Sequence, residues 1–277
     1  MSGGDPVPAV REDAATGDIA RLYADIRATL GVPVVNLVWR HLATIPGALE
    51  WSWNSVRPVY LDGAAAGAAA ALRDAMPLVP VAGLPRDALR AAGVDAAAET
   101  AIRGVLASYD RSNTMNLLTL SALRARIDGV PAEPAPALHA GGGNDAPDAL
   151  PPLLARDEMA PETWRLVLRL NALGARDDGR IVASMYRHLA HWPPFLALLW
   201  TTLSPPGQDG RLVAAIDGVQ SLAVARAPAL IGRLAPPAAA PSTAALDATR
   251  RALDDFIVHA IGKMVPVCRS IRLGMEP

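Results

Sequence analysis

The chain matches itself at a constant offset of 147 residues. The segment VVNLVWRHLATIP at positions 34–46 returns as IVASMYRHLAHWP at positions 181–193. The match continues without a gap, since Leu49, Trp53, Pro58, Asp62 and Gly63 return as Leu196, Trp200, Pro205, Asp209 and Gly210. A solenoid needs several short repeats, so two long units indicate paired halves of one molecule. We expect a functional pocket between the halves, where equivalent helices meet.

Composition excludes several classes of protein. Just over half of the 277 residues are apolar and the net charge is −1, so the chain can bury a large core and has no basic stripe for nucleic acid. Cys268 is the only cysteine, which excludes a disulfide framework and a cysteine-rich metal site. The N-terminus lacks the apolar region of a secretory signal, and prolines interrupt the longest weakly charged stretch. We expect a cytoplasmic protein with no membrane or nucleic-acid partner.

The residue pattern predicts an all-α fold. Alanine, leucine and arginine dominate, and the alternation typical of strands is absent. Residues 128–160 are rich in proline, alanine and glycine without periodicity, as in a linker. The predicted organisation is a first helical repeat at 1–127, the linker at 128–160 and a second repeat at 161–277.

Capping residues and prolines predict where the helices of the first half begin and end. One helix should begin at Asp18 and stop at Gly31, and the next should begin at Pro33 and run to about Ile45. This second helix is apolar around nearly its whole circumference, so we expect it at the centre of the fold. Further helices are predicted at 51–56, ending near Pro58, at 64–76, from about 87, and at 97–127.

Polar side chains interrupt the apolar stripe of the long helix at 97–127. Asn113 and Asn116 fall on the same face as Tyr109. Lys263 occupies the position of the second half that is equivalent to Asn116 at the 147-residue offset. Lys263 is the only lysine among 26 basic residues, which suggests a position that needs a compact charge able to bind a carboxylate. The alternative is a lysine that only extends its stem along the surface of the protein.

His41 and His188 occupy equivalent places in the two halves. Paired across an internal two-fold axis, they could bind a metal, share a proton or hold a carboxylate. Alternatively, each imidazole only bonds a backbone carbonyl in the core. We expect the preceding arginines, Arg40 and Arg187, to form structural ion pairs. The HxxH spacing of His188 and His191 is a weak zinc signal, because no third ligand accompanies it.

Two carboxylates are candidate bases. Glu50 lies between apolar residues, and Asp110 precedes Asn113 by about one helical turn. Either carboxylate could instead pair with a nearby arginine. The chain lacks the sequence signatures of a nucleophile elbow, a phosphate-binding loop or a dinucleotide-binding turn.

The order GVPVVNLVWRHLATIPG, SNTMNLLTLSAL, VASMYRHLAHWP resembles the group I 2-haloacid dehalogenases over most of the chain. The resemblance implies an all-helical fold of two pseudo-repeats with the site between them, commonly as a dimer. It also implies hydrolysis of 2-haloalkanoic acids, in which an aspartate activates the water that attacks C2 without a covalent ester.

The same resemblance assigns positions. The serine and catalytic aspartate of the family match Ser184 and Met185, and a methionine cannot act as a base. The pocket aromatics match the smaller Val34 and Leu37. The inward asparagine matches Asn113, and a neighbouring tyrosine matches Asn116.

Two functions follow from this inventory. The first is a hydrolase of small 2-substituted carboxylic acids without a cofactor, in which His188 or His41 replaces the aspartate and Asp110 is a further candidate. Lys263, Asn113, Asn116, Ser184 and His259 would bind the substrate carboxylate or the water. The second is a family member that does not dehalogenate but binds a carboxylate or a metal through His41 and His188, or catalyses another reaction. In either case we expect a homodimer.

Overall fold

The computed structural model describes residues 7–134, 149–176, 181–236 and 239–275, and over these ranges the chain is helical without a strand. The centre of the predicted linker lies outside the described residues. The helices of the first half are η1 (Glu12–Ala14), α1 (Gly17–Leu30), α2 (Leu37–Leu42), α3 (Ala48–Leu61), α4 (Ala64–Ala75), α5 (Arg86–Ala91) and α6 (Ala96–Ile127). Those that follow are η2 (Arg156–Glu158), α7 (Pro161–Ala172), α8 (Ser184–Leu189), α9 (Pro193–Gln208), α10 (Arg211–Ile231), α11 (Thr243–Asp255), the π-helical η3 (Phe256–Ile261) and α12 (Gly262–Gly274).

Helix bounds repeat at the offset seen in the sequence. Moved by 147 residues, α2 coincides with α8, and α6 coincides with the continuous helix formed by α11, η3 and α12. Equivalent glycines, Gly63 and Gly210, take a left-handed conformation before α4 and α10. The matched bounds support the interpretation that the chain is duplicated.

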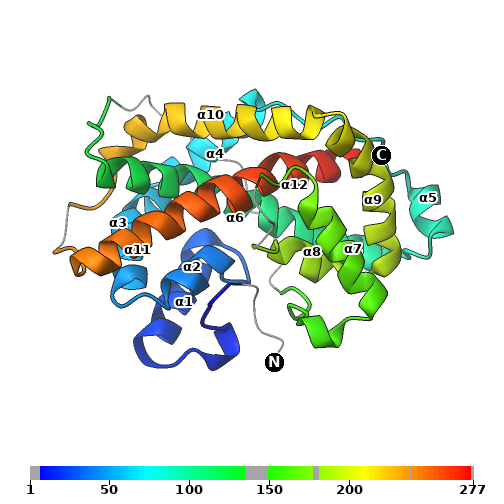
Figure 1. The fold of residues 1–277 in the computed structure, drawn as a ribbon, viewed down its shortest axis with the longest axis horizontal. Helices are drawn as coiled ribbons and strands as arrows, with labels where there is room; N and C mark the ends of the chain where they lie inside the picture. Colours follow the sequence, from blue (N-terminus) through cyan, green and yellow to red (C-terminus); the bar gives the residue numbers. More distant parts are fainter. Residues whose placement is uncertain (1–6, 135–148, 177–180, 237–238, 276–277) are drawn as a thin grey trace.

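The long helix α6 forms the centre of the molecule. It packs most extensively against α10 and α12 and also contacts α4, as Figure 1 shows. Its N-terminus is capped by the side chain of Asp95, which accepts a hydrogen bond from the backbone N–H of Ala98 at 2.8 Å. Helices α1 to α3 lie at one end of α6 and α7 to α9 at the other, so the short helices α2 and α8 approach the middle of the molecule from opposite sides.

The molecule has two apolar cores, and each contains residues from both halves of the sequence. One combines α1 to α4 with residues of α10, α11 and η3, among them Leu253 and Phe256. The other combines α7 to α9 with residues of the first half, among them Leu106 and Tyr109. Each half of the sequence therefore completes the core of the other, and the predicted repeats are not independently packed units.

The helix predicted at Pro33–Ile45 is wrong in length, because α2 covers only Leu37–Leu42. The residues before it are held extended by long-range bonds. The N–H of Val35 donates to the Glu12 carboxylate at 2.9 Å, and the side chain of Asn36 donates to Ser112 Oγ at 3.0 Å. These bonds make the extended conformation more favourable than the helix that the apolar run predicts.

Several prolines lie inside helices, among them Pro58, near which a helix was predicted to end. Helix α3 continues through Pro58 to Leu61, and α9 contains Pro205 and Pro206. An internal proline costs about 3 kcal/mol through a lost hydrogen bond and a clash. Burial of the apolar faces of these helices offsets that cost, since α3 alone buries Trp53 and Val56 completely.

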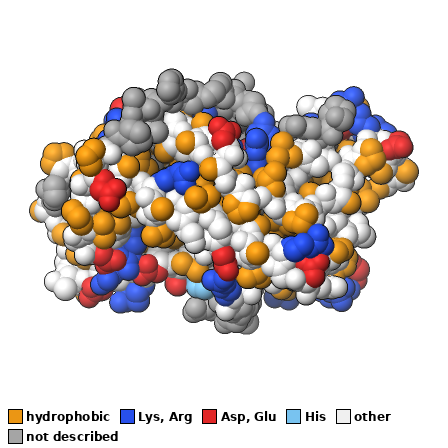
Figure 2. Space-filling view, turned by 90° about the horizontal axis from the view of Figure 1, so that it is seen from above, with side chains coloured by type: hydrophobic (Ala, Val, Ile, Leu, Met, Phe, Trp, Pro, Cys, Tyr) orange, Lys and Arg blue, Asp and Glu red, His pale blue; other side chains and the backbone are white. Residues whose placement is uncertain are grey.

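Charges are mixed over the surface. On the face drawn in Figure 2, basic and acidic side chains alternate among apolar ones. None of the described helices combines the length and the apolar character that crossing a bilayer requires.

Candidate active site

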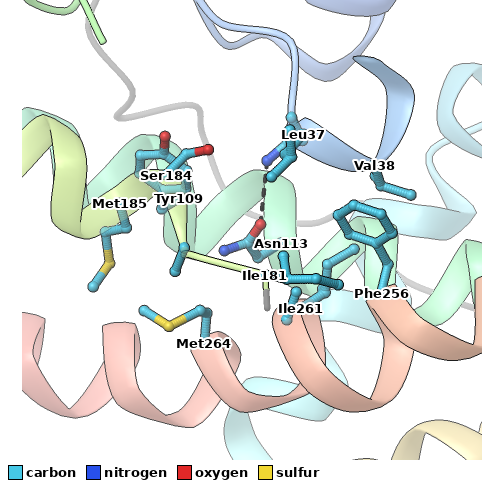
Figure 3. Close-up of a pocket in the computed structure, with 13 residues that line it drawn as sticks. Leu37, Val38, Tyr109, Asn113, Ile181, Ser184, Met185, Phe256, Ile261 and Met264 are labelled. Atoms are coloured by element: carbon cyan, nitrogen blue, oxygen red, sulfur yellow. Dashed lines mark hydrogen bonds between the residues drawn. The ribbon is translucent and has the colours of Figure 1, made fainter. Parts of the chain in front are cut away.

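A small cavity lies where the two halves meet. Its volume open to water is about 40 Å³, room for roughly three water molecules or a ligand of a few heavy atoms. Helices α2, α6, α8, η3 and α12 contribute to its wall (Figure 3). The lining residues are Asn36, Leu37, Val38, Tyr109, Asn113, Ile181, Ala183, Ser184, Met185, Phe256, Ala260, Ile261 and Met264.

The segment that leads into α8 is fixed by Asn171. Its side-chain amide donates to the carbonyl of Ile181 at 3.1 Å and accepts from the N–H of Ala183 at 3.0 Å. The buried Lys263 Nζ in turn donates to the backbone carbonyl of Asn171 at 2.6 Å. Lys263 thus supports the wall of the cavity from behind and is not among its lining residues.

Asn113 presents an amide group to the cavity. Its Oδ1 accepts from the side-chain nitrogen of Asn36 at 3.2 Å, the bond drawn dashed in Figure 3. This bond fixes the orientation of the Asn113 side chain, and its nitrogen faces the side of the cavity formed by Tyr109 and Met185. Two N–H donors are therefore available where a water molecule or a carboxylate could bind.

A chain of hydrogen bonds leads from the cavity to His188. Arg40 Nη2 donates to Ser184 Oγ at 3.5 Å, and Tyr109 Oη lies 2.7 Å from His188 Nδ1. Ser184 acts to lower the pKa of the Tyr109 hydroxyl, as do the positive charges of Arg40 and Arg187. In the tautomer whose ring proton lies on Nε2, His188 Nδ1 accepts the phenol proton of Tyr109.

Burial sets the protonation of this pair. The pKa of His188 is lowered to about 3 by burial, with further contributions from the positive charges of His191, Arg187 and Arg40. Burial also raises the pKa of the Tyr109 hydroxyl, against the opposing effects of Arg40, Arg187 and Ser184. At neutral pH both groups are therefore uncharged, and His188 is free to accept a proton through Nδ1.

His188 should make the protein sensitive to acid. The unfolded chain protonates this imidazole near pH 6.5 but the native protein only near pH 3, so its contribution to stability is complete above pH 6.5 and is lost as the pH falls toward 3. Between pH 7.5 and 5 the wild type should lose about 2 kcal/mol more than His188→Gln. Urea unfolding at the two pH values measures this difference. The matched control is His41→Gln, and an equal loss in wild type and His188→Gln would contradict the prediction.

A second and larger cavity lies beyond Tyr109. Its volume open to water is about 290 Å³, and Tyr109 lines both cavities. The buried side chains of Arg40, Arg187 and His188 line it together with residues of η1 and of the segment before η2. The bonded pair Tyr109 and His188 thus connects the two cavities.

The equivalent histidines do not have equivalent surroundings. The His188 ring lies 5.6 Å from the ring of Tyr109, and the His41 ring lies 5.5 Å from Phe256, which is the residue equivalent to Tyr109. Each histidine packs against the aromatic residue of the opposite half, but phenylalanine has no hydroxyl. His41 remains partly exposed and bonds the carbonyl of Pro8 at 2.7 Å instead. The prediction of two inward histidines is wrong for His41.

The arginines of the same motif, for which structural ion pairs were predicted, are buried. Arg40 Nε donates to the carbonyl of Val35 at 3.2 Å, and Arg187 Nε donates to the carbonyl of Leu154 at 2.8 Å. Arg187 and His188 line the same cavity because α8 is short and both side chains leave its last turn.

The structure brings together only part of the predicted site. Asn113, Ser184, Met185 and Leu37 line the small cavity, and His188 and Val34 line the large one. Asn116 accepts a hydrogen bond from Tyr60 Oη at 2.7 Å, away from both cavities. Asp110 is buried in an ion pair with Arg272 at 2.9 Å, and neither it nor His259 or Glu50 lines a cavity described here. Within the described residues no group of three metal-binding side chains occurs, so the metal-binding alternative gains no support.

Sequence reasoning missed Asn36 and the role of Tyr109. Tyr109 lies one helical turn before Asn113 on the same face of the helix, and this spacing could have indicated that Tyr109 also faces the cavity. The sequence gave no such indication for Asn36, because this residue was predicted to lie within an apolar helix.

The fold and the cavity define an all-α protein with a small, mostly apolar site between two similar halves. The chain is 30% identical over 207 residues, 72% of its length and 69% of the relative's, to a configuration-inverting 2-haloacid dehalogenase from Alcaligenes xylosoxydans xylosoxydans. No protein-family model matches it.

Solved structures share the fold. A mutant D-2-haloacid dehalogenase in complex with D-2-CPA superposes with a TM-score of 0.79 at 19% identity, covering 97% of this chain and 96% of that one. A D-2-haloacid dehalogenase with L-LA gives a TM-score of 0.77 at 18% identity with the same coverage. With the sequence relative, these findings show that the chain belongs to the 2-haloacid dehalogenase family.

Proposed function

We propose that the protein hydrolyses small 2-haloalkanoic acids to 2-hydroxyalkanoic acids in the small cavity. One observation carries the proposal: this family member has a cavity at the junction of its halves, and the polar groups of that cavity are bonded to a neutral histidine. The volume of about 40 Å³ favours substrates of two or three carbons.

The proposed base is His188, acting through Tyr109. Met185 stands where the family resemblance places an aspartate, and its thioether cannot accept a proton from water at neutral pH. A water molecule beside Tyr109 would pass a proton to Oη while the phenol proton moves to His188 Nδ1 over the 2.7 Å bond. With a pKa of about 3, His188 is nearly as basic as an ordinary aspartate, whose pKa is about 3.9.

Besides the removal of a proton from water, the displacement requires that the protein position the water and the substrate. The oxygen of water forms a bond to C2 as the bond from C2 to the halogen breaks, and the halide leaves with the electron pair. The amide of Asn113 would hold the water or the carboxylate, and the apolar side chains of Met264 and Phe256 would surround the halogen. Attack from the side opposite the halogen inverts C2.

Halide release tests this proposal. The purified protein is incubated with each enantiomer of 2-chloropropionate and of its bromo analogue, and halide and the configuration of the 2-hydroxypropionate are measured. We expect release from at least one enantiomer, with an inverted product. Retention of configuration would overturn the single displacement, and no release above the buffer for any of the four compounds would overturn the activity.

We also propose that the protein works as a homodimer in the cytoplasm. The dimer is suggested by the family to which the sequence is similar, and exposed apolar side chains such as Leu61, Leu168 and Val224 are candidates for its interface. The buried free thiol of Cys268 is compatible with a reducing compartment. Light scattering on the eluting protein tests the dimer, and fractionation of the producing cells tests the location.

A further inference from the structure

The wall that the second half contributes to the small cavity contains a π-helical turn. This turn, η3, covers Phe256–Ile261 between α11 and α12, whereas the equivalent part of α6 is a regular α-helix. The backbone N–H of Gly262 donates to the carbonyl of Ile257, five residues earlier instead of four. Turns of this kind are rare, and those inside α-helices are frequent at functional sites. The two equivalent helices therefore differ in register where they line the cavity.

The π turn changes which side chains face the cavity. It takes up about one residue more than an α-helical turn, so every later side chain is rotated by about 100° relative to a regular helix. Counted from Phe256, a regular α-helix would place Lys263 on the cavity face and turn Ile261 away from it. The structure shows the reverse, because Ile261 lines the cavity and Lys263 donates to the carbonyl of Asn171 (Figure 3).

Two residues allow the turn to form. Gly262 has no side chain, and a Cβ atom at this position would collide with the carbonyl oxygen of Ile257 and lie 2.9 Å from Gln220 Nε2. Gln220, in α10, donates from Nε2 to the carbonyl of Val258 at 2.7 Å, within the turn. The residue of α6 that is equivalent to Gly262 is Met115, so the first half lacks the glycine that the turn requires.

Ile261 gives the cavity a bulky and rigid wall. Its side chain is 5% exposed and lines the cavity with Phe256 and Met264. A β-branched side chain on a helix has one strongly preferred rotamer, so Ile261 cannot readily move aside for a larger ligand. Met264 is unbranched and flexible, and it can adjust to the ligand. The rigid Ile261 should therefore limit the size of the molecule that the cavity accepts.

We propose that Ile261, which the π turn brings into the cavity, determines substrate size and restricts the site to 2-substituted carboxylic acids with short alkyl chains. The choice of these acids rests on the proposed function. The size limit is a property of the cavity and can be measured by binding alone. One methylene group in an apolar pocket changes discrimination by about 10- to 200-fold, so a chain longer by two methylene groups should be rejected clearly.

The probes are 2-hydroxypropanoate and 2-hydroxypentanoate, which carry no halogen and cannot react. Isothermal titration should show that the wild type binds 2-hydroxypropanoate at least about tenfold more tightly. Ile261→Ala should lower this ratio of affinities at least about tenfold, because it opens room for the longer chain. The matched control is Ile257→Ala, since Ile257 lies on the same turn, is 8% exposed and does not line the cavity. A loss of packing alone would weaken the binding of both acids and leave the ratio unchanged.

A ratio that falls only in Ile261→Ala would support the proposal. A ratio that Ile261→Ala leaves unchanged, an equal change in Ile257→Ala, or a wild type that binds neither acid or both equally would overturn it. If Ile261→Ala does not fold, Ile261→Val replaces it and should change the ratio in the same direction. Halide release is measured separately. A ratio that changes as expected in a protein without halide release would contradict the proposed function and leave this inference standing.

The crystal structure of Gly262→Ala tests the π turn itself. The added Cβ atom should convert the turn to α-helical register, with Lys263 rotated toward the cavity and Ile261 away from it. An unchanged position of Ile261 in this variant would overturn the assignment of the size limit to the π turn.

Discussion

Replacing His188 with glutamine should lower kcat for halide release by a factor of about 10² to 10⁴, the usual contribution of a general base. Glutamine keeps the size and the hydrogen bond to Tyr109 but cannot take up a proton at neutral pH. KM should change little, because His188 does not line the small cavity. Tyr109→Phe should cause a loss of the same order, since it removes the hydroxyl between the cavity and the base.

The two substitutions act on one path, so their effects should not add. The double variant Tyr109→Phe with His188→Gln should be no slower than the worse single variant within a factor of about three, as for groups that work as a unit. Multiplied effects would show that the residues act independently. His41→Gln is the matched control because it changes the equivalent histidine, which lines neither cavity. A large loss of halide release in His41→Gln would indicate that His41, and not His188, is the base.

The pH profile distinguishes this base from an ordinary histidine. Because burial lowers the pKa of His188 to about 3, the imidazole stays neutral down to about pH 4, and kcat should be flat between pH 8 and 5. An imidazole with an unshifted pKa would produce a tenfold fall for each unit below about pH 6.5. A profile that bends near pH 6.5 would therefore contradict the assignment.

Sequence alone predicted the all-α class and bounds within one residue of those observed for α1, α4 and α6. These follow from local signals, such as the glycine at position 31 that ends α1 in a left-handed conformation, and from the long periodic stripe of α6. The 147-residue offset supplied what local signals could not, namely the expectation of a pocket between equivalent helices of the two halves, and residues of both α2 and α8 line the small cavity. Relatives and solved structures agree with the fold and the family.

The difference between the two histidines could not be predicted in this way. Both stand in the same RHLA motif, and the sequence offset also relates Tyr109 to Phe256. Only the three-dimensional structure shows that each histidine packs against the aromatic residue of the opposite half, so a single hydroxyl decides which one joins a hydrogen-bonded chain. Lys263 was predicted to bind the substrate carboxylate, but it is buried and donates to the carbonyl of Asn171 in α7, which is far away in the sequence.

Met185→Asp should raise kcat by at least about 10², since it would place a carboxylate base directly in the cavity instead of one that acts through Tyr109. The gain should not depend on proton transfer through Tyr109 to His188, so Met185→Asp combined with His188→Gln should keep the higher rate. Halide release by the four proteins, wild type, both single variants and the double variant, measures this. The substitution should also lower stability by on the order of 3 kcal/mol, because Met185 is 1% exposed and a buried carboxylate is costly.

Two controls separate chemistry from polarity and position. Met185→Asn has nearly the same shape as the aspartate variant but no base, so it should share the loss of stability without the gain in rate. Met264→Asp places a carboxylate on α12, on another wall of the same cavity, and should give no gain because the base must lie beside Ser184 and Asn113 to orient the water. A folded Met185→Asp protein no faster than the wild type would mean that position 185 is not where this fold activates water. That result would leave His188, acting through Tyr109, as the base of this cavity.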